Sequence, residues 1–263
     1  MKLAHDDRCQ LAEKLARDAG ELGLQYFARL DQLQVDRKGH QDLVSEADKA
    51  LEKQIRAGIK TAFPQDGILG EEDGYAAGDN DYVWVIDPID GTANFVSGIP
   101  AWTVVIALVH KSRVMSGFIY DPVMDVMYKG YDGEGAYRND SPMTVVAGAD
   151  IKAGSVAVGY SNRSKAGFIE ALVTSLVADG GVFYRNASGA LSLAYVADGK
   201  LIGYCEDHMN AWDYLAGQLM IREAGGIIEE QDIEDVLRKG GRVVASAPPV
   251  FERLLELTMN AMN

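Results

Sequence analysis

Residues 84–95 read Trp84-Val85-Ile86-Asp87-Pro88-Ile89-Asp90-Gly91-Thr92-Ala93-Asn94-Phe95. The apolar, β-branched run before Asp87 predicts a short strand buried on both faces, so Asp87 lies where that strand leaves the sheet. Pro88 has no N–H and cannot extend a ladder, so we expect the chain to turn and to bring Asp90 close to Asp87. Two carboxylates held so near to each other need a cation.

The ligand types in this stretch favour Mg²⁺ over zinc, because they are hard oxygen donors with no His or Cys nearby. The turn can also aim the carbonyl of Ile89 at the ion. Gly91 allows a close backbone approach, and a helix that begins at Thr92 would offer free N–H groups to a phosphate. The structural alternative is that Asp90-Gly91 is a simple turn and Asp87 an N-cap.

The whole stretch, including the trailing Gly-Thr-x-Asn-Phe, resembles the signature of the inositol monophosphatase family. Two more motifs of that family occur in the same order, namely Gly70-Glu71-Glu72 upstream and, downstream, Trp212-Asp213-Tyr214-Leu215-Ala216-Gly217 continuing to Glu223-Ala224-Gly225-Gly226. The resemblance implies a mixed α/β (α+β) fold, the layered αβαβα sandwich of the inositol monophosphatase and fructose-1,6-bisphosphatase type. It also implies Mg²⁺-dependent hydrolysis of a phosphate monoester.

The resemblance further implies a metal site with two or three Mg²⁺ ions. By motif position, Glu71, Asp87 and the Ile89 carbonyl hold one ion, and Asp87, Asp90 and Asp213 hold a second. Two adjacent glutamates at the end of a strand are usually unremarkable. Asp213, just before a helix predicted over 215–221, is explained equally well as an N-cap.

Ser45-Glu46-Ala47-Asp48 has the pattern of a capping box that opens a helix, which gives Asp48 a structural role. The family resemblance adds a second role, in which Asp48 and Thr92 orient the attacking water. The implied catalytic residues are therefore Thr92, Asp48, Glu71 and Asp90, and no Ser, Cys or His nucleophile is needed.

Substrate contacts are implied by the resemblance at positions spread along the chain. The amides of Gly91 and Thr92 would bind phosphoryl oxygens beside Asp90 and Asp213. Further candidates are Lys38, although exposed lysines are mostly just solvated, and Glu206, matching a position that binds a substrate hydroxyl. Ser188 and Gly189 lie where many members have Gly-Ser-Ala; the order here is Ala-Ser-Gly, which leaves a helix N-terminus available to an alcohol-bearing ligand. His208 is a possible specificity residue.

Composition limits the class of protein. The 263 residues are 48% hydrophobic, and no apolar stretch approaches the length that spans a bilayer. No secretory signal opens the sequence, so we expect a cytoplasmic protein without a membrane partner. Cys9 and Cys205 give no disulfide framework. The net charge of −14 opposes direct nucleic-acid binding, and bound cations would let so acidic a protein accept a phosphate.

Along the chain, apolar spacing predicts a helix from about Leu3 to Leu30, and polar residues predict an exposed loop over 35–42. Runs over 102–109, 114–120, 123–128 and 135–138 predict an antiparallel meander. From about residue 145 strands alternate with helices. We therefore expect an N-terminal α+β lobe, 1–144, with most metal ligands, and a C-terminal α/β lobe, 145–263, that completes the metal site and substrate pocket in one compact unit. The family is commonly dimeric.

The motifs define the chemistry more closely than the substrate. The first substrate to consider is myo-inositol monophosphate, split into inositol and phosphate. Histidinol phosphate, a 3′-phosphonucleotide and a sugar bisphosphate are alternatives within the family. A rival from another class is a regulatory protein that binds the transcription machinery or ribosomal factors, since some bacterial relatives have such a role.

Overall fold

The computed structural model describes residues 3–39, 42–148 and 150–263, and its larger sheet has eight strands in the order β10-β9-β8-β7-β6-β5-β3-β4. The strands are β3 (Gly67–Gly70), β4 (Gly74–Ala76), β5 (Tyr82–Asp90), β6 (Thr103–His110), β7 (Arg113–Asp121), β8 (Val126–Tyr131), β9 (Gly135–Arg138) and β10 (Ser141–Pro142). Strands β6 to β9 form the predicted antiparallel meander, which β5 and β10 extend at its two ends, and β3 runs parallel to β5.

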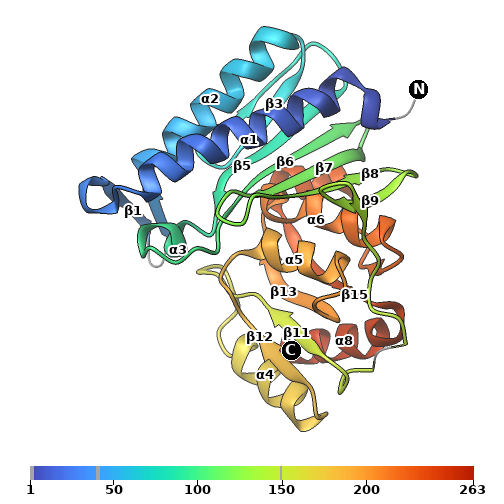
Figure 1. Cartoon of the computed structure of the whole chain (residues 1–263). Coiled ribbons are helices and arrows are strands. Elements are labelled where there is room, and N and C mark those ends of the chain that lie inside the picture. The colour runs from blue at the N-terminus through green and yellow to red at the C-terminus, as the bar shows by residue number, and fades with distance from the viewer. Residues whose placement is uncertain (1–2, 40–41, 149) are drawn as a thin grey trace.

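Two long helices, α1 (Asp7–Phe27) and α2 (Glu46–Ala62), cover one face of this sheet (Figure 1). Short 3₁₀ turns flank α1 at Leu3–His5 and Leu30–Gln32. The apolar side of α1 is buried at Ala12, Leu15, Ala16 and Ala19, which accounts for its helical spacing. The predicted capping box at the start of α2 is confirmed, since Ser45 and Asp48 bond each other's backbone N–H.

The smaller sheet has five strands in the order β12-β11-β13-β15-β14. Its strands are β11 (Ser155–Val158), β12 (Val182–Tyr184), β13 (Gly203–Met209), β14 (Ile227–Ile228) and β15 (Gly241–Ser246). The helices of this part are α4 (Phe168–Ala178), α5 (Gly189–Ala197), α6 (Ala211–Glu223), α7 (Ile233–Lys239) and α8 (Pro248–Ala261). Strand β11 is parallel to both neighbours, whereas β15 is antiparallel to β13 and β14.

Helices α5 and α6 lie between the two sheets, and α4 and α8 cover the far face of the smaller sheet (Figure 1). Both middle helices are buried over most of their length. Helix α6 approaches the large sheet so closely that a Cβ on Gly117 of β7 would lie 2.6 Å from the Cα of Ala216. The molecule therefore has the layers αβαβα, and the predicted sandwich is confirmed.

The structure differs from expectation in three segments. Residues 35–42 were expected to form a loop, but β1 (Val35–Gly39) and β2 (Asp42–Ser45) pair as an antiparallel hairpin. Backbone hydrogen bonds hold such a hairpin without an apolar side-chain pattern, so the polar sequence concealed it. Strand β4 and the short helix α7 were not predicted.

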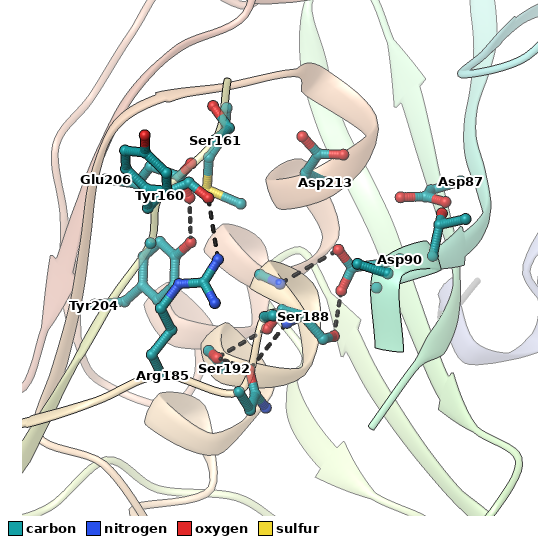
Figure 2. Close-up of a pocket in the computed structure, with 18 of the residues that line it drawn as sticks. Asp87, Asp90, Tyr160, Ser161, Arg185, Ser188, Ser192, Tyr204, Glu206 and Asp213 are labelled. Atoms are coloured by element: carbon teal, nitrogen blue, oxygen red, sulfur yellow. Dashed lines mark hydrogen bonds between the residues drawn. The ribbon is translucent and has the colours of Figure 1, made fainter. Parts of the chain in front are cut away.

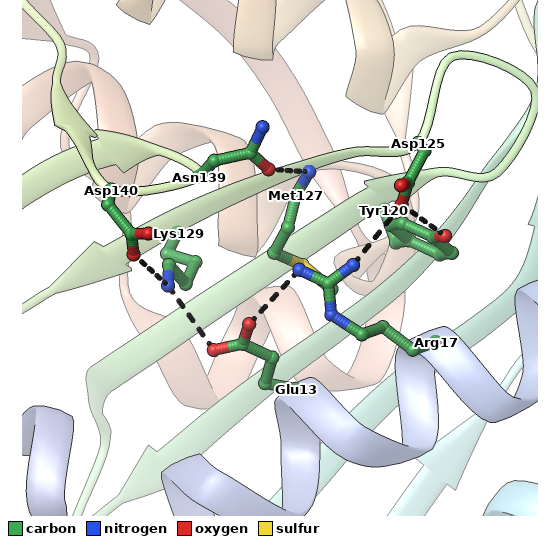
Figure 3. A network of polar contacts seen from close by, with 8 residues as sticks. All are labelled: Glu13, Arg17, Tyr120, Asp125, Met127, Lys129, Asn139 and Asp140. Atoms are coloured by element: carbon green, nitrogen blue, oxygen red, sulfur yellow. Dashed lines mark hydrogen bonds and ion pairs between the residues drawn. The ribbon is translucent and has the colours of Figure 1, made fainter.

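Polar side chains of α1 contact β7, β8 and the turn between these two strands (Figure 3). Glu13 accepts from Lys129 at 3.3 Å, and Arg17 reaches Asp125 at 3.4 Å and lies over the ring of Tyr120. The Arg17–Asp125 pair is exposed and the Glu13–Lys129 pair is only partly buried, so each pair contributes about 1 kcal/mol or less, and the apolar face of α1 holds the layer together. Among the described residues no helix is long and apolar enough to cross a membrane.

Candidate metal and phosphate site

The two aspartates of the central motif lie on either side of an irregularity in β5. Asp87 pairs with Val105 of β6, and Asp90 pairs with Thr103, so three steps on β5 match two on β6. Strand β5 therefore does not end at Asp87 as predicted. It continues through a bulge that contains Pro88, which needs no ladder N–H there. Both aspartates are buried, and an oxygen of Asp87 accepts the N–H of Ile89 at 2.9 Å.

A third carboxylate, Asp213, reaches the bulge from the first turn of α6. The prediction that Asp213 is an N-cap is wrong, because Asn210 precedes the helix and Asp213 is its third residue. Asp213 accepts the N–H of Asn210 at 3.0 Å, the inner half of a capping box. One oxygen each of Asp87, Asp90 and Asp213 lies within 4.8 Å of the others.

Glu71 approaches the same group from the end of β3. Because β3 is parallel to β5, with Gly70 beside Ile86, the next residue lies next to Asp87, and the N–H of Glu71 bonds the carbonyl of Ile86 at 3.3 Å. The Ile89 carbonyl oxygen lies on the same side, 3.1 Å from the Thr92 hydroxyl oxygen. The structure thus brings together the five groups named as ligands from sequence, and their ligand role stays a prediction.

Burial and crowding make ionisation of these carboxyls costly. The pKa of Asp87 is well above its ordinary value because of burial and the neighbouring charges of Glu71, Asp90 and Asp213. Burial raises the pKa of Asp90 to about 6, and burial together with Asp90 raises the pKa of Asp213 to about 7. A hard divalent cation fits this donor set of oxygens and would remove the repulsion.

Thr92 and Asp48 meet beside the carboxylates although they are 44 residues apart. The Thr92 hydroxyl lies 3.1 Å from an oxygen of Asp48, to which it donates, and the other oxygen of Asp48 accepts the N–H and hydroxyl of Ser45. Asp48 therefore caps α2 with one oxygen and binds Thr92 with the other. Burial raises its pKa, which the three hydrogen bonds oppose.

Gly91 precedes α3 (Thr92–Val96), a single short turn of helix. Its φ of +97° lies in the left-handed region, and a Cβ there would lie 2.9 Å from the carbonyl oxygen of Ala101. Only glycine suits this position. The predicted start of a helix at Thr92 is confirmed, and its use for phosphate stays a prediction.

The N-terminus of α5 was expected to be available to an alcohol-bearing ligand, but it holds Asp90 instead. One oxygen of Asp90 accepts the Ser188 hydroxyl and the N–H of Ala190 at 2.9 Å, and the other accepts the N–H of Gly189 at 3.3 Å. Helix N-termini favour anions, and the chain supplies its own. Substrate contacts by Ser188 and Gly189 stay predictions.

The predicted ligand groups, together with Gly91, Thr92, Ser188 and Gly189, line a cavity of about 450 Å³ (Figure 2). Its far wall carries Glu206 and Tyr204 of β13, with Arg163 and Arg185. Sequence reasoning assigned no role to the two arginines. Arg185 precedes the Ala-Ser-Gly segment by two residues and is a cation near a predicted substrate contact, whereas the loop around Arg163 gave no signal.

The remaining candidates are Lys38 and His208. The side chain of Lys38 lies outside the described part of the structure, and only its backbone, within β1, is placed. His208 was considered for specificity, but its Nε2 lies 2.9 Å from the carbonyl oxygen of Lys239 and the residue does not line the cavity. Simple alternation along β13 would put His208 on the same face as Tyr204 and Glu206. The pairing with β15 is irregular between Glu206 and Met209, and beyond this point Met209, not His208, lines the cavity.

Comparison with known proteins gives matches over nearly the whole chain. The sequence profile described as the inositol monophosphatase family matches residues 5–262. The Nus factor SuhB of Haemophilus influenzae is 35% identical over 250 residues, 93% of each chain. The inositol-1-monophosphatase of Mesorhizobium japonicum is 36% identical over 244 residues, 92% of each chain.

Solved structures give the same family. The extragenic suppressor protein suhB from Bartonella henselae has a TM-score of 0.90 at 32% identity, covering 96% of this chain and 98% of that one. An IMPase of Thermotoga maritima has a TM-score of 0.87 at 26% identity, covering 97% and 98%. With the profile matched over nearly its whole length, the chain belongs to the inositol monophosphatase family.

Proposed function

We propose that this chain hydrolyses a small phosphate monoester with the help of Mg²⁺, and that its substrate is a myo-inositol monophosphate. The observation that carries this proposal is the meeting of Asp87, Asp90 and Asp213 with the Thr92–Asp48 pair at one cavity. These groups come from separate segments, so a simple Asp-Gly turn does not explain the arrangement.

In this proposal the acidic group holds two or three Mg²⁺ ions. Glu71, Asp87 and the carbonyl of Ile89 would hold one, and Asp87, Asp90 and Asp213 another. Bound Mg²⁺ supplies charge that makes water more acidic and stabilises a leaving oxygen. The mutual repulsion of the buried carboxyls supports this use, because it is relieved when cations bind.

The chain's own residues would orient the water and the phosphate. The Thr92 hydroxyl donates a hydrogen bond to Asp48, so its lone pairs can accept a hydrogen bond from the attacking water. Asp48 cannot turn away, since Ser45 holds its second oxygen. The amides of Gly91 and Thr92 would bind phosphoryl oxygens, with Lys38 as a nearby cation. Groups of the far wall would then bind the alcohol.

A substrate panel tests the proposal. Phosphate release with Mg²⁺ should be faster from inositol 1-phosphate than from histidinol phosphate, a 3′-phosphonucleotide or a sugar bisphosphate, and should stop when a chelator is added. The relative named inositol-1-monophosphatase supports this order. Faster phosphate release from histidinol phosphate would overturn the assignment of inositol monophosphate as the substrate. Release from none of these compounds would refute the proposed phosphatase activity.

A second candidate is a regulatory protein that binds the transcription machinery, which the relatives named Nus factor SuhB favour. Native pull-down of the wild type and of a metal-site variant separates the two functions. Capture of RNA polymerase that survives loss of phosphatase activity would support regulation. If RNA polymerase is not captured, phosphate hydrolysis remains as the only proposed function.

We also propose that two copies of the chain pair in the cytoplasm through the edge of the smaller sheet. Strand β12 forms that edge, and Val182 and Phe183 on it are 59% and 50% exposed. An edge strand with apolar side chains favours pairing with another strand. The strand leads directly into Arg185 at the cavity, so pairing would also support the pocket wall.

A further inference from the structure

The far wall of the cavity contains a carboxylate that is held by its own strand. Tyr204 and Glu206 are two residues apart on β13, so their side chains lie on the same face. The hydroxyl of Tyr204 donates to Oε2 of Glu206 at 2.6 Å (Figure 2). Tyr204 is 2% and Glu206 6% exposed, so the bond is shielded from bulk water.

The charge states favour this direction of the hydrogen bond. Burial and the nearby charge of Glu206 put the pKa of Tyr204 well above its ordinary value, so the phenol keeps its proton. Burial raises the pKa of Glu206 to about 8, and the bond from Tyr204 opposes that rise by stabilising the ionised carboxylate. Tyr204 is thus the donor to Oε2, and Oε1 of Glu206 is a pure acceptor once the carboxyl has lost its proton, which at a pKa of about 8 occurs in mildly alkaline solution.

Gly159 makes room for the pair. It follows β11, and its N–H bonds the carbonyl of Cys205 at 2.9 Å, which fixes it against β13. A Cβ at Gly159 would lie 1.9 Å from Oε2 of Glu206 and 2.4 Å from the Tyr204 hydroxyl. No larger residue leaves both groups in place, so two neighbouring strands define where the carboxylate lies.

One oxygen of Glu206 remains for a ligand. Within residues 3–39, 42–148 and 150–263, Oε2 accepts the Tyr204 hydroxyl and Oε1 accepts no protein hydrogen bond, while the residue lines the cavity. A carboxylate oxygen that is free and fixed suits a hydroxyl donor on the alcohol half of a substrate.

We propose that Tyr204 is a positioning residue for substrate specificity, which holds Glu206 so that Oε1 accepts a hydrogen bond from a ring or chain hydroxyl of a polyol phosphate. This inference rests on the proposed phosphatase function and concerns the alcohol, not the phosphate. Aryl phosphates without hydroxyl groups do not use the contact.

The test compares Tyr204→Phe with the wild type on two substrates. For inositol 1-phosphate, KM should rise roughly tenfold with kcat nearly unchanged, because the lost contact acts in both the ground and transition states. For p-nitrophenyl phosphate, kcat and KM should change less than about twofold. Tyr128→Phe is the matched control, since Tyr128 is also buried and loses one hydrogen bond, from Lys200, away from the cavity.

Glu206→Ala supplies the second arm. In that background Tyr204→Phe should have almost no further effect on inositol 1-phosphate, because the group it positions is gone. If Tyr204→Phe does not fold, Gly159→Ala decides in its place, with the same substrate-selective rise in KM expected from crowding of Glu206.

Each remaining outcome overturns the inference. Equal losses on both substrates would mean that Tyr204 is merely structural, and full activity of Tyr204→Phe would mean that Glu206 needs no positioning. Wild type that hydrolyses the aryl phosphate without preference for the polyol phosphate would refute the inference and leave the phosphatase intact. Wild type inactive on both would refute the two together.

Discussion

The variant Asp90→Asn tests two effects of Asp90 separately, namely the loss of stability caused by burying its charge and its proposed role in Mg²⁺ binding and turnover. Burial raises the pKa of Asp90 to about 6, against roughly 3.9 for an exposed aspartate. That difference of roughly two units, at 1.36 kcal/mol each, puts the cost of keeping Asp90 ionised without cations at roughly 3 kcal/mol. The amide avoids this cost but loses one of the hydrogen bonds from the start of α5, roughly 1 kcal/mol.

The variant should therefore be more stable than the wild type by roughly 2 kcal/mol in chelator at pH 8, or about 5 °C in Tm. The sign follows from proton binding. Between about pH 4 and pH 6 the folded wild type holds a proton on Asp90 that the unfolded chain has lost, so stability falls as pH rises. Below about pH 4 the advantage of Asp90→Asn should disappear.

Thermal unfolding at several pH values, with chelator and with Mg²⁺, measures both effects. Added Mg²⁺ should raise the Tm of the wild type by mass action and that of Asp90→Asn much less, and turnover of the variant should fall at least roughly a hundredfold. Asp121→Asn is the control, because Asp121 is a buried carboxyl of β7 whose pKa is also raised by burial, and its Mg²⁺ response should persist. A variant less stable than the wild type in chelator at pH 8, or one that keeps its turnover, would refute the reasoning.

Three other variants test separate parts of the molecule. Thr92→Val keeps the shape but loses the hydroxyl that meets Asp48, so kcat should fall roughly a hundredfold with KM unchanged in steady-state kinetics; an unchanged kcat would remove Thr92 from the mechanism. Asp66→Asn should lower the free energy of unfolding by roughly 3 kcal/mol at pH 7, because buried Asp66 loses a two-point ion pair with Arg8. Hydrogen bonds from Arg8 and two other donors overcome burial and hold the pKa of Asp66 low, so this difference should shrink as pH falls below about 4; a difference constant with pH would contradict it. Phe183→Asp should turn a dimer into a monomer by size-exclusion chromatography with light scattering; if the dimer remains, β12 is not the interface.

Local sequence patterns predicted the parts of the fold that depend on neighbours in the chain. The Ser45–Asp48 capping box, the meander after the central motif and the helix near the start of the chain all follow from spacing and turn residues. Where two local explanations competed, the choice could fail. Asp213 at a helix start resembles an N-cap, but Asn210 had the better position for that role.

Contacts between distant segments were beyond such reasoning. Asp90 binds the start of α5 about a hundred residues later, and no pattern around either segment announces that pairing. The bulge in β5 was also hidden, because a proline after a strand predicts an end as readily as an irregularity. Family motifs, not periodicity, indicated that Glu71 and Asp213 belong with Asp87.

Because α6 packs so closely on β7, a substitution in β7 can displace the carboxylate of Asp213, although β7 lies outside the cavity. Asp213 is carried by a helix whose next turn rests, backbone against backbone, on Gly117, with no side chain between to absorb a change. A single added methyl group there would push the whole helix and displace a carboxylate whose own sequence is intact. A substitution in an interior strand can therefore abolish the function of the cavity while every residue that lines the cavity is unchanged.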